Sequence, residues 1–278
     1  MNFSIQKIIK NLKTNGYATI GKTISQNICD QAKIDILKLK NNLKKNAKFI
    51  DEGSSKGQEI IRDLPLRNPD AFLKFIDLTP VIKILENIFK DHFILDNSMA
   101  SNSVNVSNEY NRKVHIDSQM PVSDFNLTTD VVVMIFLDDF KIKNGATKVW
   151  PGSHKLGIRV HHEKKINKKK LRNSEYLTGP KGTISIMLGQ TWHQVGKNIT
   201  NESRWSIFLH YKRWWMKPST DFTSCGKKIF KKLNSKQKQL FGFTSMPPKF
   251  NFLKKTKNIY MMRSIKQVSK NYRKALNH

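Results

Sequence analysis

The chain has 278 residues, of which 38% are hydrophobic and 10% aromatic, and it carries a formal net charge of +29. This composition supports a substantial buried core and excludes a disordered or fibrous protein. No apolar run is long enough to span a bilayer, and the first residues lack the apolar core of a secretion signal. Because Cys29 and Cys225 form no disulfide framework, we expect a cytoplasmic protein.

Helical patterns dominate the first 92 residues. Apolar residues recur at helical spacing from Ile5 to Leu12, and Asn15-Gly16 ends this pattern before a strand-like stretch at residues 16–20. Two later helices are expected where Asn68-Pro69 and Thr79-Pro80 place a proline in the first helical turn.

A longer helix is expected between these segments, because Ser25 is suited to cap it. Its apolar residues predict the face that is buried, with lysines elsewhere. This predicted face comprises Ile28, Ile34, Leu37, Leu39 and Leu43. A polar, glycine-containing loop is expected to follow at residues 51–56.

Strand-like patterns replace helical ones after residue 93. Residues 130–137 are almost wholly apolar and rich in valine, which is typical of a strand buried on both faces. Residues 182–188 form a second such run and residues 204–211 a third. Since helices come first and strands later, the order excludes an alternating βαβ protein.

These patterns predict a mainly β fold with flanking α-helices. We expect a single domain over residues 1–220, with amino-terminal helices over 1–92 and a β core over 93–217. Residues 221–278 are expected to form a basic, helical extension packed on or beside that core.

The sequence Val114-His115-Ile116-Asp117 contains two side chains that can both bind a metal. In a strand, alternate residues point to the same face, so His115 and Asp117 would project together. The best third ligand is His193, which follows a strand-like run. Two histidines and one carboxylate on one side of a metal are typical of non-haem Fe(II) oxygenases. The short pattern alone also arises by chance.

A buried cation is predicted at Arg204. Alternation along residues 204–211 places Arg204, Ser206, Phe208 and His210 on one face. If this strand pairs with residues 182–188, Arg204 and His193 would lie near the same end of the sheet. An inward guanidinium is costly unless it meets an anion, and a dicarboxylate cosubstrate would supply one, with Ser206 as a second donor.

Several motifs together resemble the phytanoyl-CoA dioxygenase family of Fe(II)- and 2-oxoglutarate-dependent oxygenases, over about Gly16 to Pro218. The order and spacing of the motifs carry the resemblance. They are His115-x-Asp117, Asn144-Gly145-Ala146-Thr147, Pro151-Gly152-Ser153-His154-Lys155, Trp192-His193 and Arg204.

This resemblance implies a double-stranded β-helix, a jelly-roll relative of the cupins. It implies that His115, Asp117 and His193 bind iron and that Arg204 binds the C5 carboxylate of 2-oxoglutarate, with Thr147 as a neighbour of the cosubstrate. The implied reaction consumes O2, hydroxylates a C-H bond and releases succinate and CO2. Relatives that halogenate lack the ligand carboxylate, so Asp117 favours hydroxylation.

Four aromatic residues or pairs that are not assigned to the metal or the cosubstrate receive structural interpretations. We expect His154 to make a local hydrogen bond within its turn and His210 to be a core histidine. Trp192 is expected to steady its neighbour His193 by packing, and Trp214-Trp215 to belong to the core or to a pocket wall.

The partner prediction depends on charge. After Asp221 the chain has 15 basic residues and no acidic one. Positive charge favours an anionic substrate, and we expect a small or carrier-linked metabolite. The basic segment could pack on the core or contact an anionic membrane surface, through a helical pattern at Ile259, Met262, Ile265, Val268, Tyr272 and Leu276.

The alternative is a non-catalytic family member that binds anionic membrane or nucleic acid through this segment. No specific nucleic acid is predicted, and the sequence does not define the oligomeric state.

Overall fold

The structure is a computed structural model that describes residues 4–45, 57–105, 113–120, 122–160 and 173–245. The loop expected at 51–56 and the helical pattern at 259–276 lie outside the described residues.

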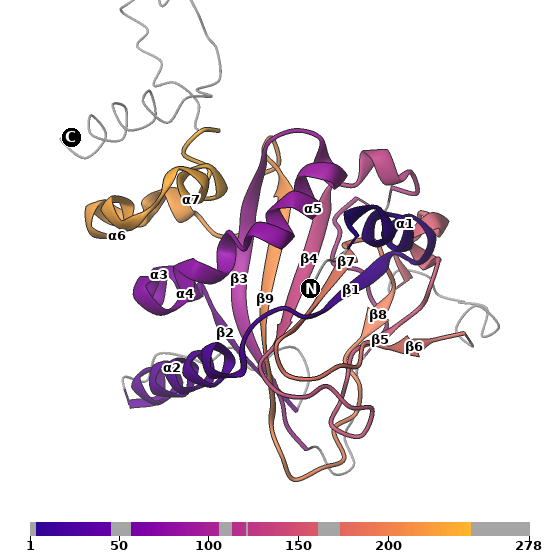
Figure 1. The fold of residues 1–278 in the computed structure, drawn as a ribbon, viewed down its shortest axis with the longest axis horizontal. Coiled ribbons are helices and arrows are strands. Elements are labelled where there is room, and N and C mark those ends of the chain that lie inside the picture. Colours follow the sequence, from indigo (N-terminus) through magenta and orange to yellow (C-terminus); the bar gives the residue numbers. More distant parts are fainter. Residues whose placement is uncertain (1–3, 46–56, 106–112, 121, 161–172, 246–278) are drawn as a thin grey trace, which may run out of the picture.

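Two antiparallel sheets form the centre of the molecule (Figure 1). The larger sheet has the strand order β1-β7-β4-β9-β3-β2 and the smaller one the order β6-β5-β8. The larger sheet contains β1 (Tyr17–Lys22), β2 (Gln58–Arg62), β3 (Phe93–Ser103), β4 (Asp130–Phe136), β7 (Thr183–Leu188) and β9 (Arg204–Arg213). The smaller sheet contains β5 (Lys148–Val149), β6 (Glu175–Tyr176) and β8 (His193–Gln194).

The two sheets pack against each other through one apolar group, the interior cluster. It contains side chains from both sheets and from the loops between them. Its buried members are Val132, Met134, Phe136, Phe140, Ala146, Val149, Leu177 and Met187. The alternate residues of β4, Val131, Val133 and Ile135, join the helix-covered core instead. The prediction of a strand buried on both faces is therefore confirmed.

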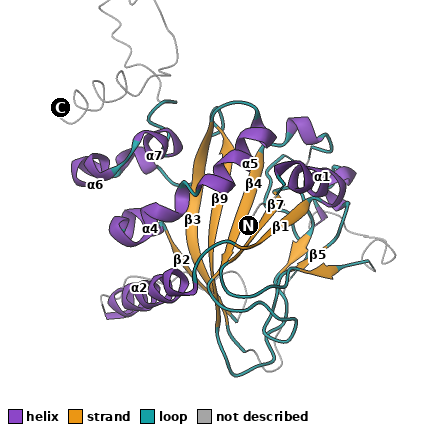
Figure 2. Ribbon diagram, in the orientation of Figure 1, coloured by secondary structure: helices purple, strands orange, loops and turns teal. Residues whose placement is uncertain are grey.

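Helices cover the outer face of the larger sheet (Figure 2). They are α1 (Ile5–Asn15), α2 (Gln26–Lys45), α3 (Leu64–Arg67), α4 (Pro69–Ile76) and α5 (Thr79–Phe89). The predicted helix starts at Asn68-Pro69 and Thr79-Pro80 are confirmed. Gly16 ends α1 in the left-handed conformation, with φ of 87°, and its N–H donates to the carbonyl of Leu12.

The predicted buried face of α2 is largely wrong. Ile28, Ile34 and Leu37 are 41%, 46% and 39% exposed. The stripe that faces the sheet contains Cys29, Ala32 and Ile36, which were not predicted, together with Leu43, which was. The predicted Leu39 is partly buried against the same core. Small residues at Cys29 and Ala32 let the helix lie close to the sheet, and the Cys29 thiol lies 3.8 Å from the carbonyl oxygen of Phe136. Because apolar residues occur on both sides of this helix, periodicity alone did not define its inner face.

The first 92 residues supply more than helices, because β1 and β2 form the two edges of the larger sheet. The strand-like stretch at 16–20 is confirmed as β1, whereas β2 was not predicted. The domain limits proposed from the sequence stay a prediction.

Residues after Asp221 continue into α6 (Gly226–Lys232) and α7 (Ser235–Leu240). Their apolar side chains, including Phe222, Phe230 and Leu240, belong to the helix-covered core. Gln237 Nε2 also donates to the carbonyl of Leu73, 3.2 Å away. Within the described residues, no helix combines the length and apolar character that crossing a bilayer requires.

Candidate metal and cosubstrate site

His115 and His193 face each other across a short antiparallel bridge. The N–H of each residue donates to the carbonyl of the other, at 2.9 and 3.0 Å, and the ring centroids are 4.1 Å apart. Asp117 lies two residues beyond the bridge, with carboxylate oxygens 3.9 Å from His115 Nε2 and 3.5 Å from His193 Nε2. One ligand atom from each of the three residues fits within 4.8 Å of the others, so the structure brings the predicted triad together.

The backbone sets the tautomer of both rings. Nδ1 of His193 lies 3.0 Å from the carbonyl oxygen of Thr191, and Nδ1 of His115 lies 3.1 Å from that of Lys113. Since a carbonyl oxygen can only accept, each Nδ1 carries the hydrogen. The lone pair is therefore on Nε2, the atom that faces Asp117, as a metal ligand requires.

The Asp117 carboxyl is suited to bind a cation. Burial by itself raises its pKa, but the neighbouring His193, His210 and His115 outweigh burial and hold the pKa below its ordinary value. The carboxylate is therefore ionised near neutral pH. Two imidazole nitrogens and one carboxylate on one side of a centre match the donor set of non-haem Fe(II) sites.

Aromatic packing supports His193. Trp192 is 1% exposed and packs with Ile116, Trp150 and Val160. The Trp150 N–H donates to the carbonyl of Trp192 at 3.0 Å, and Trp192 Nε1 donates to that of Ile158 at 3.2 Å. The prediction that Trp192 steadies its neighbour by packing agrees with these contacts.

Arg204 is a buried cation whose hydrogen bonding is incomplete. Its side chain is 2% exposed, and the guanidinium lies 4.0 Å above the ring of Phe140. Nε donates to the carbonyl of Asn144 at 3.3 Å, whereas Nη1 has no hydrogen-bond partner among the described residues. Burial lowers the pKa of Arg204 to about 9, and Asp138 opposes this effect. An anion at Nη1 would complete the site.

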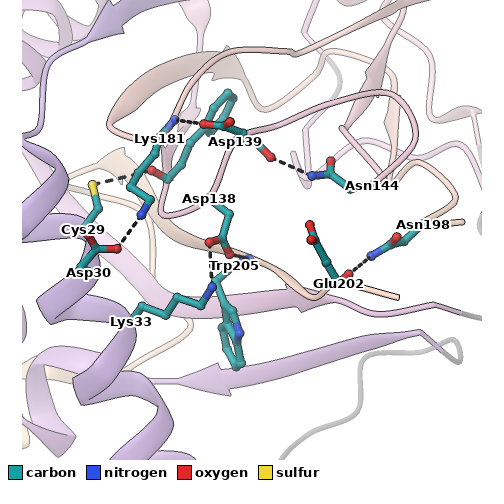
Figure 3. Close-up of polar contacts among 11 residues, drawn as sticks. Cys29, Asp30, Lys33, Asp138, Asp139, Asn144, Lys181, Asn198, Glu202 and Trp205 are labelled. Atoms are coloured by element: carbon teal, nitrogen blue, oxygen red, sulfur yellow. Dashed lines mark hydrogen bonds and ion pairs between the residues drawn. The ribbon is translucent and has the colours of Figure 1, made fainter. Parts of the chain in front are cut away.

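Two residues next to Arg204 are held in place by hydrogen bonds, Trp205 beside it in the chain and Asn144 beside its guanidinium. Figure 3 shows the contacts of Trp205 and Asn144. Asp138 accepts from the N–H of Trp205 at 2.8 Å and pairs with Lys33 of α2 at 2.7 Å. Asn144, whose carbonyl meets the guanidinium, is itself fixed because its side-chain amide donates to the carbonyl of Asp139. Asn144 appears in the family motif, but only the structure shows this role.

A polar hollow of about 720 Å³ opens beside this network. Its charged lining is nearly balanced, with Lys33, Lys141, Lys143 and Lys181 against Asp138, Asp139 and Glu202. Several of these groups are already paired, as in Lys33 with Asp138 and Lys141 with Asp139. Because its positive and negative side chains are balanced and partly paired, the hollow does not attract a ligand of one charge. Its residues are part of the network that supports Arg204.

One short segment, residues 144–149, connects the Arg204 site to the triad. Asn144 contacts Arg204 at one end, and Val149 pairs with His193 at the other. Thr147 lies between them, buried, with its hydroxyl 3.9 Å from the sulfur of Met134. Ser206 is fully buried and its hydroxyl donates to the carbonyl of Ser101 at 3.4 Å, so the cosubstrate contacts of Thr147 and Ser206 stay predictions.

The strand pairing that was expected to bring Arg204 and His193 together is wrong. β4 lies between β7 and β9, and His193 belongs to β8 in the other sheet. The two residues approach the same interior from opposite sheets. The pairing of strands distant in sequence depends on the whole fold, which local alternation does not report.

Three further aromatic residues differ from expectation or add to it. His154 is buried as expected of a structural residue, but its Nε2 meets the carbonyl of Lys13 in α1, so the contact is not local. Trp215 is 54% exposed, so it does not belong to the core, and its place in a pocket wall stays a prediction. His210 lies across from Val132 of the interior cluster and close enough to Asp117 to lower its pKa.

The fold and this site define a class, a double-stranded β-helix with a two-histidine, one-carboxylate centre. A model of the phytanoyl-CoA dioxygenase (PhyH) family matches residues 12–206, and the chain belongs to that family. The uncharacterized proteins Rv1501 of Mycobacterium tuberculosis and Mb1539 of Mycobacterium bovis are each 23% identical over 188 residues. The match covers 66% of this chain and 66% of the length of each relative.

Solved structures share the fold at low identity. HygX from Streptomyces hygroscopicus, with nickel and 2-oxoglutarate bound, is 11% identical, with a TM-score of 0.63 over 78% of this chain and 90% of its own. SnoN, a non-heme alpha ketoglutarate dependent epimerase from nogalamycin biosynthesis, is 16% identical, with a TM-score of 0.59 over 75% and 80%. These likenesses confirm the predicted double-stranded β-helix. The predicted iron and 2-oxoglutarate agree with the groups bound by these neighbours, since SnoN was also solved with Fe3+ and alpha ketoglutarate.

Proposed function

We propose that the protein is an Fe(II)- and 2-oxoglutarate-dependent dioxygenase that hydroxylates a C-H bond of a small or carrier-linked metabolite. One observation carries the proposal. It is the combination of a complete set of three metal ligands with a buried guanidinium that has an unsatisfied donor. Both groups adjoin the interior cluster, His193 through Val149 and Arg204 through Phe140. The first suits a divalent metal and the second suits a carboxylate, and 2-oxoglutarate is a ligand that can engage both.

The chain's own residues then have separate tasks. Nε2 of His115, Nε2 of His193 and the Asp117 carboxylate would hold the metal and leave its other positions for cosubstrate and O2. When bound, the iron supplies the oxygen-activating chemistry, in which 2-oxoglutarate becomes succinate and CO2 and the substrate gains an oxygen atom. Arg204 would pair with the C5 carboxylate through two N–H groups, because the planar guanidinium matches a carboxylate.

Burial strengthens the Arg204 interaction. The guanidinium is desolvated before any ligand arrives, so a carboxylate that meets it displaces no ordered hydration shell. The ring of Phe140 and the carbonyl of Asn144 fix the orientation of the guanidinium, which lowers the entropic cost of binding. Thr147 and Ser206 are assigned to the surroundings of the same carboxylate.

A non-catalytic role in binding a membrane or nucleic acid is less well supported. Such a role gives no reason to keep an unsatisfied guanidinium at 2% exposure, since that arrangement costs stability. The substrate itself is proposed only as a class. The structural neighbours include both an epimerase and a protein solved with hygromycin B bound, so the product has to be identified directly.

The test is an anaerobic titration of the Fe(II)-loaded protein with 2-oxoglutarate, followed by the visible charge-transfer band of the chelate. We expect the band in wild type and in His92→Ala, a histidine variant outside the site, and no band in His193→Ala. A fully metallated wild-type protein without the band would contradict the proposal. With a substrate found by screening for succinate release, a product enlarged by one oxygen atom would establish hydroxylation, and an isomer of the substrate would indicate epimerisation.

A further inference from the structure

We propose that Asp130 is a positioning residue of the metal centre, which fixes the Asp117-Ser118 backbone so that the Asp117 carboxylate faces the two histidines. The inference rests on the proposed metal site. Asp130 is the first residue of β4 and is 5% exposed. The sequence marked it only as the polar residue at the start of an apolar strand.

The Asp130 carboxyl holds the residue next to the ligand. Its Oδ2 accepts from Ser118 Oγ at 2.8 Å and from Thr129 Oγ1 at 2.7 Å. Ser118 follows Asp117 directly in the chain. The hydrogen bond therefore restrains the turn that carries the third ligand.

Gly189 connects the same two segments from the other side. Its carbonyl accepts from the N–H groups of both Asp117 and Ser118, each at 2.9 Å, and its own N–H donates to the carbonyl of Asp130 at 3.0 Å. A Cβ added at Gly189 would overlap Oδ1 of Asp130. The Asp130 carboxyl thus fills the space over Gly189. A glycine is required at position 189 because a larger residue would displace that carboxyl.

Asp117 needs this support more than the histidines do. His115 and His193 are fixed to each other by the two bridging hydrogen bonds of their backbones. Asp117 lies past the end of that bridge, and its side chain is 24% exposed. Its position depends on Gly189, and the position of Gly189 depends in turn on Asp130.

The arrangement is costly for Asp130 itself, which argues for a role beyond filling space. No ion pair in the described part of the chain includes this carboxyl, because the amine of its cross-strand neighbour Lys212 lies 2.8 Å from Asp96 instead. Burial raises the pKa of Asp130, and the two hydroxyl donors only partly oppose this. An apolar residue at the head of β4 would avoid the cost but would release Ser118.

The test compares Asp130→Asn with Asp96→Asn. Asp96 is a matched control because it is buried to 4% exposure and its partners are Lys212 and Ser219 rather than the Asp117 turn. For each variant, Co(II) affinity and the visible Co(II) spectrum would be measured by anaerobic titration, and the stability of the metal-free protein by urea unfolding. Ser118→Ala, which removes one hydroxyl donor, serves as the milder variant if Asp130→Asn does not fold.

We expect both Asn variants to lose stability, whereas only Asp130→Asn and Ser118→Ala lose Co(II) affinity, by about 10- to 100-fold, as is usual for groups that orient metal ligands. Gly189→Ala alone should lower the Co(II) affinity similarly. In a protein that already carries Asp130→Ala, which lacks the overlapping oxygen, the added Gly189→Ala change should lower the affinity by less. Wild-type affinity and spectrum in Asp130→Asn, or an equal loss in Asp96→Asn, would overturn this inference alone. A wild-type protein that binds no metal would overturn both this inference and the proposed function.

Discussion

Replacing Arg204 by methionine should make the ligand-free protein more stable while abolishing its response to 2-oxoglutarate. The side chain is 2% exposed, and burial lowers its pKa to about 9. A shift of that size means that the charged form costs the folded protein roughly 4–5 kcal/mol. Methionine removes this cost and keeps an unbranched apolar side chain in contact with Phe140.

The losses on substitution are smaller than this gain. The hydrogen bond to the carbonyl of Asn144 contributes about 1 kcal/mol. Stacking on the ring of Phe140 contributes up to about 2 kcal/mol at a desolvated site. The variant should therefore gain about 1–2 kcal/mol, which corresponds to a rise of roughly 2–8 °C in Tm for a chain of this size.

The assay is urea and thermal unfolding of the metallated protein with and without 2-oxoglutarate. At a concentration of 100 times its Kd, the cosubstrate should stabilise wild type by about 2.7 kcal/mol and the variant by nothing measurable. Arg213→Met is the matched control on the same strand, because each of the three guanidinium nitrogens of Arg213 donates to a carbonyl, those of Thr128, Phe89 and Asn126. That variant should lose about 2–4 kcal/mol and keep its response to 2-oxoglutarate.

An Arg204→Met protein that unfolds at clearly lower urea concentration than wild type would show that the guanidinium is not strained by burial. Equal stabilisation of variant and wild type by 2-oxoglutarate would show that Arg204 is not the carboxylate site.

Two further predictions follow from single contacts. Gly16→Ala should destabilise the protein by about 2–4 kcal/mol in urea unfolding, because φ is 87° and the added Cβ would overlap Thr191 and His154. Gly21→Ala, with the same φ and no atom within 4 Å, should cost only about 1–2 kcal/mol, and equal costs would rule out the steric explanation. The buried Cys29 thiol, whose pKa burial raises to about 11, should stay unmodified by iodoacetamide at pH 8 until the protein is unfolded, as followed by mass spectrometry. Only the thiolate reacts with iodoacetamide. Modification of Cys29 at the same rate in folded and unfolded protein would therefore contradict the burial and the raised pKa of this thiol.

The metal ligands could be proposed from sequence because they rest on short-range regularities. Strand alternation predicted that His115 and Asp117 share a face, and the same rule placed Arg204 and His210 on one face of β9. In the structure only His115 forms a bridge, and Asp117 lies in the turn after it. The helix starts at Asn68-Pro69 and Thr79-Pro80 were equally local, since capping and proline geometry act within one turn. The family motifs then supplied the third ligand, His193, which local patterns could only suggest.

Errors appeared where the outcome depended on distant segments. The inner face of α2 was mistaken because the sheet selects which of several apolar stripes it contacts, and small residues at Cys29 and Ala32 allow the closest approach. The pairing of the strands at 182–188 and 204–211 was mistaken because β4, more than 40 residues earlier in the chain than β7, lies between them. β2 was missed because its five residues become a strand only by pairing with β3.

By itself, the sequence determined the mainly β class, the family and the residues suited to bind metal and a carboxylate, because propensity, alternation and motif spacing are properties of neighbouring residues. Only the tertiary structure decided that two sheets enclose one interior, that Arg204 reaches it with an unsatisfied donor, and that Asp130 and Gly189 hold the Asp117 turn. These features are contacts between residues separated by tens of positions. Their existence depends on which strands and helices pack together, and that choice minimises the free energy of the whole chain rather than of any one segment.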